Sequence, residues 1–313
     1  MRFVVLDTRT THLETGTTPM RKIPLLAAIF FGLSTAAASA QDWKPIQDVL
    51  GRKGKVDEGI LRITFPRSDL KVSLKGIPVP ADLALDTWYG FWPQPDGKMM
   101  LMGDTVVQES ELAGVLEEVR RQGLEITAIH NHLAGETPHI LFTHMSGMGD
   151  GVDLARKAKA VLARTKAPTG EEPEKKKSTV DWSAVTSVLG KPAETEGTMI
   201  EFAFQRAEKL SMMGHDMPST DALETAPEVK LNMLKDGKAV SYGEMILVAD
   251  EVNPVFQALT EHGMTVNALH NHMVREEPRL FFMHWWGVGQ PKELATGLRA
   301  ALEKINVRKA SEE

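Results

Sequence analysis

The sequence predicts an α+β fold in which two similar repeats of mixed strands and helices pack as a pseudo-twofold unit. The first observation is a long-range repeat: residues 128–144, AIHNHLAGETPHILFTH, recur as residues 268–284, ALHNHMVREEPRLFFMH, at a constant offset of 140. Between residues 124–149 and 264–289, ten of 26 positions are identical. This period exceeds the roughly 20–50 residues of solenoid repeats and indicates a duplicated domain. The second observation is that strand and helix patterns mix without strict βαβ alternation, which is typical of the α+β class.

Each repeat opens with an Asp-Trp pair, at residues 42–43 and 181–182, and a short helix is expected after it. The next segments are GILRITF, residues 59–65, and MIEFAF, residues 199–204. Their apolar, β-branched and aromatic content predicts a strand in each copy. A segment containing Gly and Pro follows each strand and predicts irregular structure.

Long strands are expected at GKMMLMGDTVV, residues 97–107, and GKAVSYGEMILV, residues 237–248. A helix, the histidine-rich strand, a turn and a second strand should follow. Closing helices are then predicted at residues 152–163 and 291–305.

The first of those helices has predicted start and stop signals in both copies. Ser110 and Asp250 each precede a glutamate and a helical pattern, so they are expected to be N-caps. Gly123 and Gly263 should end the two helices.

The segment KAPTGEEPEKKKSTV, residues 166–180, is rich in Pro, Glu and Lys and has no apolar periodicity. It predicts a linker between the copies. The first repeat is therefore assigned to residues 41–165 and the second to residues 181–308.

The N-terminal residues predict export. Met20-Arg21-Lys22 begins residues 20–40, which are interpreted as a signal peptide, and residues 1–19 as an upstream extension. The apolar run of residues 23–33 is too short to span a bilayer. The small-x-small sequence of residues 38–40 predicts cleavage before Gln41. A periplasmic or secreted protein is expected, with no stable membrane anchor after cleavage.

Composition limits the chemistry. The chain has no cysteine, which excludes disulfides, thiolate nucleophiles, cysteine-ligated zinc and a lipid anchor on an N-terminal cysteine. Residues 1–40 hold four basic and two acidic side chains, so their removal changes the net charge from −6 to −8. Such a charge argues against nucleic acid as a partner. The contiguous His-Asn-His also differs from the HNH nucleases, where those residues are spread over a ββα-metal unit.

The duplicated unit, the HNHxxxExPxxxFxH stretch and the helix start DEVNPV, residues 250–255, resemble the LppY/LpqO family of exported bacterial proteins, a domain of unknown function. The resemblance covers essentially the whole mature chain. The first copy departs from it, because residues 109–111 replace the counterpart of DEVNPV. Members named for mycobacterial lipoproteins carry a lipidated cysteine that is missing here. The resemblance implies export and a fold, and no activity.

The histidine-rich stretches are the candidate functional site. Residues two apart on a strand face the same side, so His130 and His132 can share one divalent cation. Glu136 follows four residues later, the spacing of cupin-type sites. The second copy repeats the set as His270, His272 and Glu276. Zinc, iron or manganese can accept two histidines and a carboxylate and keep a position open for water or substrate.

A third histidine completes each candidate ligand set, as His144 and His284. If residue 132 faces residue 138 or 139 across the turn, His144 lies roughly 10–14 Å from His130. One flat hairpin then cannot bring all three histidines to one metal. His144 can join only if its strand bends sharply, or if a histidine crosses over from the other repeat.

A second interpretation remains open, in which the histidines form a polar structural network. In this interpretation the protein is an exported ligand-binding or structural domain, which can take a small ligand. In the alternative interpretation, with a metal bound by the histidines, it is a metal-dependent enzyme. Two weaker patterns stand beside it. Arg67 with Asp69, matched by Arg206 with Glu208, can clamp an anion or form an ordinary ion pair. The methionines of residues 212–217 can bind Cu(I) or fill the core.

Overall fold

The computed structural model describes residues 41–171, 174–190 and 193–308. The predicted extension and signal peptide, residues 1–40, lie outside the described residues. Within the described ranges, no helix is both long and apolar enough to cross a membrane.

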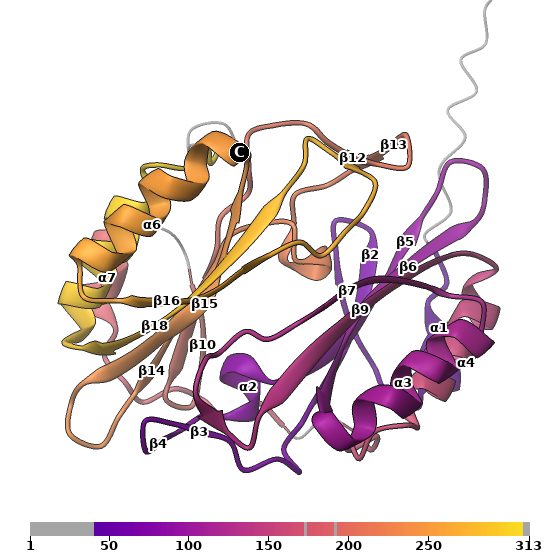
Figure 1. Ribbon diagram of the computed structural model, residues 1–313, viewed down its shortest axis with the longest axis horizontal. Helices are drawn as coiled ribbons and strands as arrows, with labels where there is room; N and C mark the ends of the chain where they lie inside the picture. The colour runs from indigo at the N-terminus through magenta and orange to yellow at the C-terminus, as the bar shows by residue number, and fades with distance from the viewer. Residues whose placement is uncertain (1–40, 172–173, 191–192, 309–313) are drawn as a thin grey trace, which may run out of the picture. The chain divides into compact units, whose positions relative to one another are not determined.

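The first repeat forms one six-stranded antiparallel sheet with the strand order β1-β2-β5-β6-β9-β7 (Figure 1). The first repeat also contains a three-stranded sheet with the strand order β4-β3-β8. The elements are α1 (Lys44–Leu50), β1 (Lys55–Asp57), β2 (Ile60–Pro66), β3 (Ser73–Leu74), β4 (Ile77–Pro78), α2 (Ala81–Ala84), β5 (Asp86–Pro93), β6 (Met99–Gln108), α3 (Glu109–Arg121), β7 (Glu125–His130), β8 (Glu136–Thr137), β9 (Ile140–Gly149) and α4 (Gly151–Leu162).

The second repeat forms the corresponding sheet, in the order β10-β11-β14-β15-β18-β16, and a small sheet β13-β12-β17. Its elements are α5 (Ser183–Leu189), β10 (Glu194–Glu196), β11 (Met199–Ala203), β12 (Leu210–Met212), β13 (His215–Met217), η1 (Asp221–Leu223), β14 (Glu228–Met233), β15 (Ala239–Leu247), η2 (Ala249–Glu251), α6 (Val252–Glu261), β16 (Thr265–His270), β17 (Glu276–Glu277), β18 (Phe281–Gly289) and α7 (Pro291–Leu302). Because both sheets have the same strand order, the predicted α+β fold of two similar repeats is confirmed.

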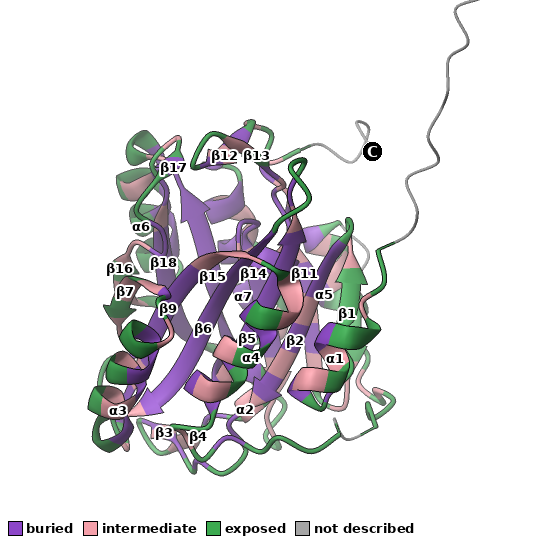
Figure 2. Cartoon of the chain, turned by 90° about the vertical axis from the view of Figure 1, so that its right-hand side faces the viewer, coloured by how far each residue is buried: buried purple, intermediate pink, exposed green. Residues whose placement is uncertain are grey.

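The period of two along the strands separates two faces of each sheet. On β6, Leu101 and Val107 face outward and pack with the helices of their own repeat. Met100 and Met102 face inward and pack with Phe282 of the second repeat. The second sheet packs in the same way, so helices cover the outer faces and the inner faces meet (Figures 1 and 2). Strands β6, β9, β15 and β18 are mostly buried, and the space between the sheets is therefore the central layer of the fold.

Two long strands, β5 and β14, and the short strands β3, β4, β12 and β13 lie where irregular structure was expected, and that expectation was wrong. β5 is DTWYGFWP and β14 is EVKLNM. β5 contains Gly90 and ends at Pro93, which are turn signals in isolation, yet its six middle residues are all buried. Pairing with β2 on one side and β6 on the other stabilises this strand in spite of its local sequence.

The predicted N-caps were also wrong, whereas the helix ends are confirmed. α3 begins at Glu109, before Ser110, and Glu111 accepts a hydrogen bond from the backbone N–H of Gln108 at 3.0 Å. The carboxylate of Glu251 does the same for Val248 at 2.8 Å. A glutamate reaching back to the helix start replaces a cap by Ser110 or Asp250. The expected glycines, Gly123 and Gly263, follow the helix ends with φ values of +66° and +75°.

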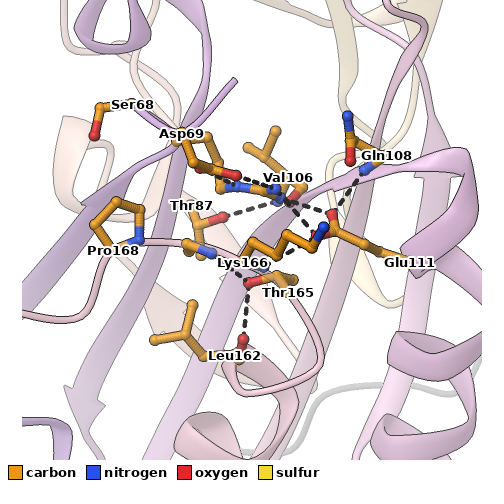
Figure 3. A network of polar contacts seen from close by, with 12 residues as sticks. Ser68, Asp69, Thr87, Val106, Gln108, Glu111, Leu162, Thr165, Lys166 and Pro168 are labelled. Atoms are coloured by element: carbon orange, nitrogen blue, oxygen red, sulfur yellow. Dashed lines mark hydrogen bonds and ion pairs between the residues drawn. The ribbon is translucent and has the colours of Figure 1, made fainter. Parts of the chain in front are cut away.

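Glu111 also explains the paired arginine and acid of the first repeat (Figure 3). The Arg67 side chain is fully buried and donates to both carboxylates, Asp69 and Glu111, and to the carbonyl of Val106. Arg206 repeats this arrangement in the second copy, with Glu208, Glu251 and the carbonyl of Ile246. These contacts support the ion-pair interpretation, since they use the guanidinium donors that an anionic ligand would need.

The methionines of residues 212–217 are divided between core and surface. Met212 and Met217 are buried in the layer between the sheets, whereas Met213 is 44% exposed. Two of the three thioethers therefore fill the core.

Candidate metal centre

His144 lies next to His130, which corrects the distance expected from the sequence. His130 pairs with Phe142, and Ala128 pairs with His144, so the two histidines are diagonal neighbours on one sheet face. Their ring centroids are 4.8 Å apart. The expectation failed because residues 131–139 form a long excursion that includes β8, and not a tight turn. Without a tight turn, β9 can start almost level with the end of β7.

Histidines also cross between the repeats, as one of the two routes from the sequence required. The ring centroids of His130 and His270 are 3.6 Å apart. The other two pairs are His132 with His284 and His144 with His272, each at 3.8 Å. Exchange of equivalent residues maps the first pair onto itself and the second pair onto the third. The six rings therefore have pseudo-twofold symmetry and lie between the sheets.

Two overlapping sets of side chains bring possible ligand atoms within 4.8 Å of one another. The first set is His132, Glu244, His270, His272 and His284. The second set is His130, His132, His144 and His272. His132 and His272 belong to both sets, and each set takes residues from both repeats. Neither hairpin alone completes a set.

Two carboxylates of the centre were missed from the sequence. Glu244 lies 3.1 Å from Nε2 of both His272 and His284, and Asp104 lies 3.6 Å from Nε2 of His144. Both acids face inward from the middle of the buried strands β15 and β6. The signal for them was present in the sequence, because Gly-Asp and Gly-Glu stand 140 residues apart in otherwise apolar strands.

The predicted carboxylate ligands, Glu136 and Glu276, do not belong to either set of converging ligand atoms. Glu136 accepts a hydrogen bond from the backbone N–H of Ile140 at 3.1 Å. Glu276 does the same for Leu280 at 3.2 Å and also contacts Arg279. Each glutamate therefore holds the start of the strand that carries the third histidine. Glu244 occupies the position among the rings that sequence spacing gave to them.

Many buried polar atoms of the cluster have no hydrogen-bond partner. Among the described residues, they include Nε2 of all six histidines, Oε1 of Glu244 and Oδ1 of Asp104. On His284 the opposite nitrogen, Nδ1, lies 3.0 Å from the carbonyl oxygen of Gly243, which can only accept. The hydrogen of a neutral ring is then on Nδ1, and Nε2 carries the lone pair. On His132, Nδ1 lies 2.9 Å from the hydroxyl of Tyr242.

Burial keeps five of the six imidazoles neutral. Burial lowers the pKa of His130 to about 3, and the neighbouring His284 adds to the shift. The pKa values of His132, His144, His270 and His272 are also lowered, first by burial and then by the other histidines. Neutral imidazole is the form that binds a metal.

The donor set fits a divalent transition metal. Imidazole nitrogens with one carboxylate suit zinc, iron, copper and nickel better than calcium or magnesium, which prefer oxygen ligands. A metal bound here would supply Lewis acidity and could lower the pKa of a bound water. The chain itself supplies converging, buried imidazole nitrogens that make no hydrogen bond.

Comparison with solved structures gives only low similarity. A trimeric bacterial microcompartment shell protein, PduB, is 11% identical, with a TM-score of 0.21 over 83% of this chain and 97% of that chain. EtuB from Clostridium kluyveri is also 11% identical, with a TM-score of 0.18 over 80% of this chain and 88% of that chain. Such scores support no argument about fold or function. No curated protein sequence matches the chain.

The two repeats match one family. The sequence model of a Domain of Unknown Function (DUF1259) matches residues 44–164 and again residues 183–304. Together the matches cover more than half of the chain and correspond to the two six-stranded sheets with their helices. The chain therefore belongs to the DUF1259 family and carries its domain twice.

Proposed function

We propose that this protein binds a divalent transition metal between its two repeats. The observation that carries the proposal is the convergence of buried nitrogens that make no hydrogen bond: ligand atoms from both copies lie within 4.8 Å of one another, and the carboxylate of Glu244 lies among them. Buried polar groups normally have hydrogen-bond partners, so several orphaned atoms facing one point favour an absent ligand.

The alternative of a purely structural network is less well supported. A structural histidine uses both ring nitrogens in hydrogen bonds or leaves one in contact with solvent. Here Nε2 of each ring is buried and makes no hydrogen bond, although Glu244 lies 3.1 Å from two of these atoms, whereas Nδ1 of His132 and His284 have hydrogen-bond partners. Such a partner on the opposite nitrogen is what orients a metal-binding histidine. Among the metals considered from the sequence, zinc and iron suit this imidazole-rich set better than manganese.

Zinc binding tests this proposal. The purified chain, treated with chelator and then titrated with Zn²⁺ by calorimetry, is expected to bind zinc specifically. His132→Ala plus His272→Ala removes the two residues common to both sets. We expect the affinity to fall by more than the roughly 10–100-fold that loss of an outer-shell partner costs.

His139→Ala plus His215→Ala is the matched control, because it also removes two histidines and neither lies in the cluster. It should bind zinc like the unmodified chain. If the unmodified chain binds zinc no tighter than the His132/His272 variant, the histidines are structural and the metal proposal is wrong. Circular dichroism of both variants establishes that they are folded.

We also propose that the protein is exported to the periplasm or secreted, as a member of the group described as LppY/LpqO. The support is the charge, apolar run and small-x-small site within residues 20–40, together with the sequence features shared with that group. Mass spectrometry of the native protein should find an N-terminus at Gln41. A native protein that retains residues 1–40, or that fractionates with the cytoplasm, contradicts the proposal.

A further inference from the structure

Two cavities flank the histidine cluster, one on each side of the pseudo-twofold axis, and they are unequal. The first, of about 40 Å³, reaches His132 and His284. The second, of about 10 Å³, reaches the equivalent residues, His272 and His144. The larger volume suffices for a water molecule, whereas the smaller one is at the lower limit.

Divergence between the repeats explains the difference. Trp88 pairs with Asp104 on the first sheet, and Glu228 occupies the matching position opposite Glu244 on the second. Trp88 and Met102 line the small cavity, together with Met212, Leu223 and Met273, and all five belong to the apolar layer between the sheets. On the other side, Glu228 and Tyr242 replace Trp88 and Met102. One side of the cluster, which we call the closed side, is thus narrowed mainly by apolar side chains, and the other is lined mainly by polar ones.

The polar side continues outward. A third cavity, of about 200 Å³, shares four lining residues with the 40 Å³ cavity. These residues are Arg62, Asp86, Glu228 and Lys230. Its other walls include Lys53, Lys55 and Glu194, which are exposed. Residues on the surface are therefore connected to the histidine cluster through two adjoining polar cavities.

The charged side chains that line these two cavities determine which charge a ligand can carry. Arg62 pairs with Glu224 at 3.0 Å, and Lys230 pairs with Glu228 at 3.1 Å. Asp86 and Glu201 add two further carboxyl groups to the lining. The arginine and lysine side chains of the 40 Å³ cavity are thus both paired, and carboxyl groups outnumber them there, so a small anion gains no unpaired cation beside the cluster. A neutral ligand or a metal cation meets no such barrier.

We propose that, of the two related cavities, the one lined by Glu228 and Tyr242 is the entrance to the metal-binding nitrogens, and that this mouth admits a neutral, water-sized oxygen ligand. Water fits, and so does the carbonyl or hydroxyl oxygen at the narrow end of an uncharged molecule. The inference rests on the proposed metal site, and it adds an entrance and a ligand class.

The Tyr242 hydroxyl is placed to contact such a ligand. Its oxygen lies 2.9 Å from Nδ1 of His132. When Nε2 of His132 is the metal-binding nitrogen, Nδ1 carries the ring hydrogen and donates it to the tyrosine oxygen. The hydroxyl hydrogen of Tyr242 is then free to donate into the cavity.

Water access can be measured on the copper-loaded chain. Cu²⁺ is the probe, because nitrogen sites that hold zinc hold copper more tightly, and its paramagnetism accelerates the relaxation of exchanging water protons. Electron paramagnetic resonance first establishes nitrogen ligation at one equivalent. We expect the loaded wild type to increase the longitudinal relaxation rate of solvent protons. Glu228→Trp, which copies Trp88 of the closed side, should abolish that increase and retain the nitrogen-ligated signal.

Tyr242→Trp, which enlarges the other side chain at the entrance, is a second blocking variant and should also abolish the increase. Met102→Leu on the closed side is the matched control and should leave it unchanged. Equal relaxation in wild type and in a blocking variant that retains nitrogen-ligated copper overturns the entrance. No increase in the loaded wild type overturns it too. Copper that gives only an aquo signal overturns the metal site itself, and the entrance with it.

Discussion

At the scale of single residues, Asp86 shows how the acidic surplus at the mouth affects stability. Burial raises the pKa of the Asp86 carboxyl to about 7, although Lys230 and Arg62 oppose the shift. One of its oxygens is buried and has no hydrogen-bond partner. Between its ordinary pKa and about 7, the folded protein holds this proton and the unfolded chain releases it. The Asp86 contribution to stability is therefore complete at low pH and is lost as the pH rises through this range.

Asp86→Asn should remove this loss, because the amide cannot ionise. Relative to wild type, the variant should gain stability as the pH rises from about 4 to about 7, by at most about 1.4 kcal/mol per pH unit. Urea unfolding of both metal-free proteins at several pH values measures the difference in the free energy of unfolding. A difference that is constant with pH, or that reverses in sign, contradicts this prediction.

At the scale of elements, the sequence predicted those parts of the fold that local pattern determines. The strands around Leu101 and Ser241, the helix-ending glycines Gly123 and Gly263, and the closing helices all follow from short-range periodicity and chain stereochemistry. β5 could not be predicted in this way, since its Gly and Pro are turn signals and its stability comes from neighbouring strands that are distant in sequence.

The candidate site was also predicted only in those parts that local sequence determines. His130 and His132 lie near each other as expected, with ring centroids 5.0 Å apart, although β7 ends at His130 and His132 lies beyond the strand. The position of His144 depended on the path of residues 131–139, which pair with the distant strand β3. The role of Glu136 as a backbone acceptor depended on the same excursion. Local spacing therefore could not distinguish a ligand carboxylate from one that stabilises a loop.

At the scale of the whole molecule, duplication is what creates the site. One repeat alone presents three histidines and one acid on an inner sheet face, and the second repeat supplies the opposing face. The two inner faces also bury large apolar side chains from both copies, such as Trp88 with Phe282 and Phe142 with Trp286. The same layer therefore provides both the apolar contacts that hold the repeats together and the candidate metal ligands. Divergence at Glu228 and Tyr242 then distinguishes the two sides of a nearly symmetric centre.

If this layer and not the linker holds the repeats together, cutting the linker should leave them associated. Residues 174–177 are exposed, so a specific protease site inserted between Lys175 and Lys176 is accessible. After cleavage, the two fragments should elute together in size-exclusion chromatography in native buffer and separate in urea, because burial of apolar side chains drives their association. The uncut protein with the same insertion is the control. The cut pair should also bind zinc as the control does, since each ligand set takes residues from both fragments. Fragments that elute separately in native buffer would show that the linker supplies the association.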